Sequence, residues 1–183
     1  MHPDFQLLDA AMDGDLEGAI KAIEAGASAN ATDVDDTTPL YHALIQGHLP
    51  LAHFLVTAGA EFNATFGKRN QTLLHWAAEN GSYGFCHFLL EYKANINVQR
   101  TDGATPLLLA AKGGHEYVVR LLLKHDAYIS PRTSGNATAR SAAQKQGHTS
   151  IVSMIDEAAV TRPGYLKDAD NAFPSGSRER FLF

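Results

Sequence analysis

The stretch TPLLLAAKGGH, residues 105–115, recurs along the chain in related forms. Beginning at Thr38, Thr72 and Thr138, the corresponding segments read TPLYHALIQGH, TLLHWAAENGS and TARSAAQKQGH. A further copy, FQLLDAAMDGD from Phe5, keeps the alanine pair and the glycine but lacks Thr-Pro. The shared glycines lie 33 or 34 residues apart, at Gly14, Gly47, Gly81, Gly114 and Gly147. A fixed period of this length predicts a fold made of repeated supersecondary units.

The first half of each copy has the signals of a short helix. Thr38, Thr72 and Thr105 stand where the N-cap of a helix is needed. Pro39 and Pro106 follow at the first helical position, where proline is tolerated because its missing N–H has no intrahelical partner. The alanine pairs inside these helices are small enough to let helices of neighbouring copies approach closely.

A second helix is predicted behind each glycine. In EYVVRLLLKHDA, residues 116–127, the apolar side chains recur at three- and four-residue spacing, which is typical of a helix with one buried face. Polar stretches then lead into the next copy, and their composition predicts hairpin-like tips at Asp33–Thr37, Phe66–Gln71, Gln99–Ala104 and Arg132–Ala137. Each unit is therefore predicted as helix, tight turn, helix and extended tip.

This pattern resembles the ankyrin-repeat family, whose unit is about 33 residues long and carries a T-P-L-H-x-A motif. The resemblance implies an all-α solenoid of five helix-turn-helix units with short β-hairpin-like tips. We predict one repeat domain over residues 1–160, followed by a C-terminal extension at 161–183. The predicted units cover about residues 4–36, 37–70, 71–103, 104–136 and 137–160.

Some positions depart from a uniform repeat. Gly26 and Gly59 are predicted to take the left-handed conformation at the end of the second helix, whereas Lys93 and Asp126 occupy the same position in later copies. We therefore predict strain in those two turns. In the last copy Arg140 replaces a leucine that the other copies bury, as expected of a capping repeat with one face toward water.

The extension after residue 160 is rich in aromatic residues although it has no periodicity. It contains Tyr165, Phe173 and the Phe181–Phe183 group. We predict that these side chains pack over the last repeat, because an exposed apolar cluster would favour aggregation. The alternative is a short linear motif for a peptide-binding domain.

No catalytic, cofactor-binding or metal-binding arrangement is recognisable in the sequence. His48, His115 and His148 follow the repeated glycine, and the resemblance implies that they are structural, with hydrogen bonds between neighbouring loops and helices. Cys86 lies in an apolar helix and is predicted to be a buried, inert thiol. We expect no enzyme activity, no cofactor and no metal.

The sequence has no signal-peptide pattern and no apolar run long enough for a membrane span. Its single cysteine cannot form an internal disulfide, which favours a reducing compartment. We therefore expect a cytoplasmic protein, monomeric on its own, with the nucleus or delivery into a host cell as alternatives.

Charge is distributed unevenly along the chain. Residues 1–65 carry a net charge of −9, whereas residues 66–145 carry +5. Along the predicted tips the sign changes from Asp33 to Lys68, Arg69 and Arg100. A solvated surface without partner preference would explain this, but the gradient could also orient a charged partner.

The ankyrin resemblance implies a protein–protein interaction module that binds through the concave face, formed by tips and first helices. The expected partner is a protein with an acidic segment. The alternative is a nucleic-acid-binding or substrate-recruiting module that uses the basic tips, and a net charge of −5 weakens the nucleic-acid interpretation. The predicted contact residues are Tyr41, Ile45, Gln46, Phe66, Lys68, Arg69, Trp76, Glu79, Asn80, Arg100, Asp102 and Lys112.

Overall fold

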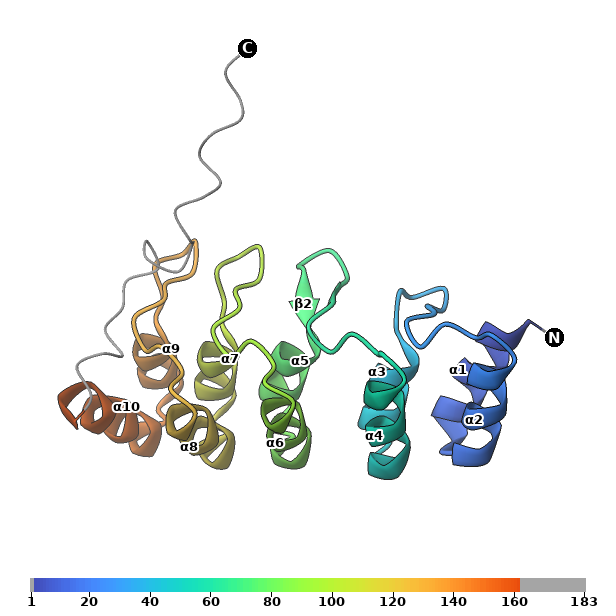
Figure 1. Cartoon of the computed structure of the whole chain (residues 1–183). Coiled ribbons are helices and arrows are strands. Elements are labelled where there is room, and N and C mark those ends of the chain that lie inside the picture. The colour runs from blue at the N-terminus through green and yellow to red at the C-terminus, as the bar shows by residue number, and fades with distance from the viewer. Residues whose placement is uncertain (1, 162–183) are drawn as a thin grey trace, which may run out of the picture. The chain divides into compact units, whose positions relative to one another are not determined.

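A computed structural model describes residues 2–161 of the protein (Figure 1). The prediction that the C-terminal extension packs over the last repeat lies outside these residues. The helices are α1 (Pro3–Asp13), α2 (Leu16–Glu24), α3 (Pro39–Ile45), α4 (Leu49–Thr57), α5 (Leu73–Glu79), α6 (Tyr83–Glu91), α7 (Pro106–Gly113), α8 (Glu116–Lys124), α9 (Ala139–Gln146) and α10 (Thr149–Thr161). Two short strands, β1 (Thr65–Phe66) and β2 (Gln71–Thr72), complete the described elements.

The described residues divide into two compact units, residues 2–74 and residues 75–161. In the first unit α1 packs on α2 and α3, and α4 packs on α3 and α2. In the second, α8 packs on α6 and α7, while α9 and α10 pack on each other and on α7 and α8 respectively. Helix pairs with short connections give the predicted all-α ankyrin-repeat solenoid, which is confirmed.

Threonine side chains cap three of the first helices; the sequence predicted this role for Thr38 and Thr105 but did not name Thr138. The hydroxyl oxygens of Thr38, Thr105 and Thr138 each accept a hydrogen bond of 3.2 Å from the backbone N–H three residues later. These bonds satisfy N–H groups that have no partner inside the helix. Thr72, also predicted as an N-cap, is the last residue of β2 and directly precedes α5.

Each predicted tip is closed by backbone hydrogen bonds. In the first unit β1 and β2 pair antiparallel, with Phe66 opposite Gln71. At the other tips the two sides are joined by bonds from the N–H of residues 33, 100 and 133 to the carbonyls of residues 37, 104 and 137. The tips lie at one end of the first helices in each unit (Figure 1).

The apolar columns of the repeat form the core of each unit. Leu40 and Leu74 in the first unit and Leu107 in the second are at most 1% exposed. Arg140, the corresponding residue of the last copy, is exposed, and its guanidinium contacts the carboxylate of Asp156 on α10 at 2.6 Å. The capping character predicted for this copy is therefore visible at that position.

The four helix ends predicted to be left-handed all have positive φ. Gly26 and Gly59 have φ of 93° and 95°, and Lys93 and Asp126 have φ of 61° and 66°. This conformation costs a residue with a side chain roughly 1–2 kcal/mol relative to the right-handed one. The predicted strain in the two non-glycine turns is thus confirmed.

Candidate functional site

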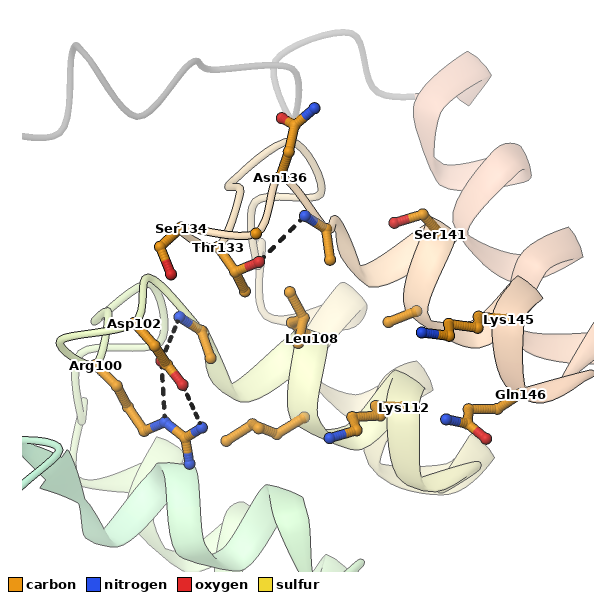
Figure 2. A pocket seen from close by; sticks show the side chains of 15 residues that line it. Arg100, Asp102, Leu108, Lys112, Thr133, Ser134, Asn136, Ser141, Lys145 and Gln146 are labelled. Carbon is orange, nitrogen blue, oxygen red and sulfur yellow. Dashed lines mark hydrogen bonds and ion pairs between the residues drawn. The ribbon is translucent and has the colours of Figure 1, made fainter.

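A groove lies in the second unit, between two tips and the helices α7 and α9 (Figure 2). Its volume is about 560 Å³, which is within the range of ligand-binding clefts. Leu108 and Leu109 of α7 and Ala142 of α9 form an apolar part of the wall. Polar side chains from residues 100–102, 133–136 and the last turns of both helices surround it.

Arg100 organises the first of these tips instead of projecting into solvent. Its guanidinium donates to both carboxylate oxygens of Asp102, at 3.3 and 2.8 Å, and contacts Glu79 at 3.4 Å. Asp102 also accepts from the N–H of Ala104 at 3.0 Å. The Arg100 side chain is only 5% exposed. Three predicted contact residues are thus brought together, but the charge of Arg100 is already balanced within the unit.

The second tip joins the first through its backbone. The N–H of Ser134 donates to the carbonyl of Asp102 at 2.9 Å. Within the tip, Thr133 Oγ1 accepts from the N–H of Ala137 at 3.1 Å, a contact drawn in Figure 2. These bonds fix the two tips side by side, so that the groove between them and the helices is held open by backbone structure.

Lys112 and Lys145 are the exposed cations on the helices of the groove (Figure 2). Lys112 was among the contact residues predicted from sequence, whereas Lys145 was not. Lys145 nevertheless stands 33 residues after Lys112, in the same column of the repeat. Carrying Lys112 forward by one period would therefore have found it.

The remaining predicted residues of the second unit lie near α5. Trp76 is half-buried and stacks against Phe85 with ring centroids 5.6 Å apart, as packing in the core requires. Asn80 is exposed, and its amide donates to the carbonyl of Trp76 at 2.9 Å. Trp76 thus contributes to packing and keeps part of its ring accessible.

In the first unit the predicted residues form a small aromatic cluster. The rings of Tyr41 and Phe66 meet edge to face with centroids 5.6 Å apart, and both side chains are half-buried. Ile45 is 37% exposed and Gln46 is exposed. Burial, together with the charge of Asp33, raises the pKa of Tyr41, so this phenol is neutral near pH 7.

The acidic tip of the first unit is held by its own side chains. Asp33 accepts hydrogen bonds from Thr37 Oγ1 at 2.6 Å and from the Asp35 N–H at 2.9 Å, and lies 2.9 Å from His42 Nε2. Burial raises the pKa of Asp33, but the bonds from Thr37 and His42 outweigh burial and lower it overall. Asp33 thus shapes the tip. Lys68 and Arg69 are exposed in the turn between β1 and β2.

Two of the three histidines that follow the repeated glycine, His115 and His148, connect neighbouring copies, as predicted. His115 Nε2 lies 2.9 Å from the carbonyl of Glu79, and His148 Nε2 lies 3.2 Å from that of Lys112. His75 is fully buried and contacts the Ala104 carbonyl at 3.0 Å. Burial lowers the pKa of His75 to about 4, which keeps its ring neutral at pH 7.

Chemically reactive groups are few in the part of the chain that the structure describes. Cys86 is fully buried, and burial raises the pKa of its thiol to about 12, as expected of an inert cysteine. Within residues 2–161 no three His, Cys, Asp or Glu side chains are arranged to hold a metal ion. Nor does any helix there combine the length and apolar character needed to cross a membrane.

The family described as ankyrin repeats (3 copies) matches residues 7–100 and 94–161. The chain therefore belongs to the ankyrin-repeat family, whose repeats are in general protein–protein interaction modules and are typically not enzymatic.

Among known proteins, the chain is 36% identical to Inversin of Canis lupus familiaris over 109 residues, which are 58% of this chain and 10% of that protein. It is 33% identical to Protein lin-12 of Caenorhabditis elegans over 96 residues, covering 51% of this chain and 7% of that protein. It is 34% identical to a probable E3 ubiquitin-protein ligase of Oryza sativa subsp. japonica over 115 residues, covering 60% and 23%. The chain thus spans less than a quarter of each of these relatives.

Proposed function

We propose that this chain is an intracellular protein-binding module, acting as an adapter, inhibitor, assembly factor or effector. The observation that carries the proposal is the groove of the second unit, whose wall combines leucines with exposed lysines. Such a mixture of apolar and charged groups suits a polypeptide, because a partner protein can supply both kinds of side chain.

In the first unit the half-buried rings of Tyr41 on α3 and Phe66 on β1 supply apolar contact area, together with Ile45 at the end of α3. Aromatic residues with part of their surface exposed are the usual sources of binding energy in protein interfaces. We propose that they act as anchors, while the exposed charges of the tips mainly guide encounter. On its own the module is expected to be monomeric.

The proposal is tested with a partner identified by cross-linking in cells and then reconstituted from purified proteins. Tyr41→Ala and Phe66→Ala should each weaken binding about tenfold or more, because they remove anchors. Glu91→Ala on the outer helix α6 is the matched control and should leave the affinity unchanged. An oligonucleotide that binds the purified chain when no protein partner does would overturn the proposal.

A further inference from the structure

The groove of the second unit carries positive charge that its own tips do not neutralise. Arg100 is paired with Asp102 and Glu79, as described above. In residues 2–161 no ion pair or hydrogen bond engages the side chains of Lys112 and Lys145, and both are exposed. The lysines therefore remain available to an anion entering the groove.

The two lysines are spaced by the fold itself. They occupy the same column of successive copies, Lys112 in the last turn of α7 and Lys145 in the last turn of α9. Because α7 and α9 pack directly on each other, the spacing of their axes is about 8–10 Å. A lysine side chain is long and flexible, so each ammonium group can adjust by a few ångströms toward a ligand.

An extended peptide matches that spacing. Residues two apart in an extended chain point to the same side and are separated by about 7 Å. Two carboxylates in the order acid–any–acid can therefore each approach one lysine. The residue between them points the other way, whereas apolar residues two positions before or after the acidic pair point to the same side as the carboxylates and can contact Leu108 and Ala142.

We propose that this groove binds an extended segment of a partner protein that carries two carboxylates separated by one residue. The inference rests on the proposed protein-binding function and names the chemistry that the second unit recognises. The hydroxyl of Ser134 and the amide of Gln146, which also line the groove, are placed to donate hydrogen bonds to the backbone carbonyls of such a segment.

The test uses the full chain and fluorescein-labelled octapeptides at low salt, with binding measured by fluorescence anisotropy. The first peptide alternates glutamate with alanine, and the second has the same composition with its glutamates grouped in adjacent pairs, Glu-Glu-Ala-Ala-Ala-Glu-Glu-Ala, so that no two of them are separated by exactly one residue. The alternating peptide is expected to bind, more tightly than the grouped one, and its affinity should fall as salt is raised. Failure of the alternating peptide to bind, or equal binding of the two, overturns the proposal.

Charge-reversal variants locate the site. Lys112→Glu combined with Lys145→Glu should weaken binding of the alternating peptide by about tenfold or more, because two attractions become repulsions. The control, Arg120→Glu with Lys124→Glu on α8, makes the same change in net charge outside the groove and should have less than about a twofold effect. An equal loss of affinity in both variants would mean that the peptide responds only to the net charge of the protein. It would contradict the assignment of the peptide to this groove.

Two further ligands separate this proposal from its rivals. A phosphoserine peptide, or a single-stranded oligonucleotide, that displaces the alternating peptide at about a tenth of its concentration would overturn the assignment to carboxylates. The reconstituted protein partner distinguishes failure of the groove proposal from failure of the proposed protein-binding function. If it binds normally to the Lys112→Glu/Lys145→Glu variant and poorly to Phe66→Ala, the groove is not its site although the protein-binding function stands.

Discussion

At the scale of single residues, the repeated glycine is explained by the histidine that follows it one copy later. Gly81 has φ of 67°, and a Cβ atom built on it would lie 2.5 Å from Nδ1 of His115. The same ring is held by its hydrogen bond to the Glu79 carbonyl. Gly147, at the end of α9, has φ of 80° but open space around it. A side chain at Gly147 would therefore meet only backbone strain, whereas a side chain at Gly81 would meet backbone strain and a steric clash with His115.

We predict that Gly81→Ala destabilises the protein more than Gly147→Ala does. Both changes force alanine into the left-handed region, at roughly 1–2 kcal/mol. Only Gly81→Ala must also displace His115 and break its hydrogen bond, which adds about 1 kcal/mol. The midpoint of urea unfolding, followed by circular dichroism, measures the difference. Equal midpoints for the two variants would show that His115 does not restrain this position.

His75 predicts a pH dependence of stability. Its pKa is lowered to about 4 in the folded protein, chiefly by burial, against about 6.5 when unfolded. Between these values the unfolded chain binds a proton that the folded chain does not, so stability falls as pH drops from 6.5 to 4. The slope from this residue is at most about 1.4 kcal/mol per pH unit.

Replacing His75 by glutamine tests this effect, since the amide can still donate to the Ala104 carbonyl but does not titrate in this range. The variant should lose less stability than the parent protein between pH 7 and pH 5, as measured by urea unfolding at both values. The other histidines contribute equally to both proteins. An unchanged pH slope would mean that His75 is not the titrating group.

At the scale of elements, α9, the first helix of the last described copy, differs from the first helices of the other copies. Arg140 of α9 takes the place of the leucine column and pairs with Asp156 of α10. We predict that Arg140→Leu promotes self-association, because it restores an apolar residue where no further copy follows within the described chain. Light scattering after size-exclusion chromatography measures this, with the exposed Arg120→Leu on α8 as control. Equal self-association of both variants would show that Arg140 has no particular role in keeping the protein monomeric.

The helices and caps could be predicted from sequence because their signals are local. Thr105 caps α7 through an N–H only three residues away, and the leucine column repeats with a fixed period. The state of Arg100 could not be predicted in this way. Its charge is balanced partly by Glu79, which lies 21 residues earlier and approaches only when α5 and the tip are folded. Sequence therefore identified Arg100 as a residue of the tip but not as an internally paired one.

At the scale of the whole molecule, charge is segregated along the chain, and this predicts an effect on association rates. Residues 1–65 carry a net charge of −9 and residues 66–145 carry +5. Lys68 and Arg69 are exposed at their tip, whereas Arg100 is buried by its partners. The first two residues are therefore better placed than Arg100 to attract an acidic partner through solvent.

We predict that Lys68→Glu combined with Arg69→Glu slows association with a protein partner carrying an acidic segment, by roughly tenfold at low salt. Dissociation should change less than about twofold, because contacts at the rim of an interface act mainly on encounter. Surface plasmon resonance at two salt concentrations separates the two rates, and the difference in association should shrink at high salt. Arg120→Glu with Lys124→Glu is the control of equal charge. Faster dissociation of the Lys68→Glu/Arg69→Glu variant would instead mean that these two residues anchor the partner directly. If the control slows association equally, only the net charge of the molecule determines the rate.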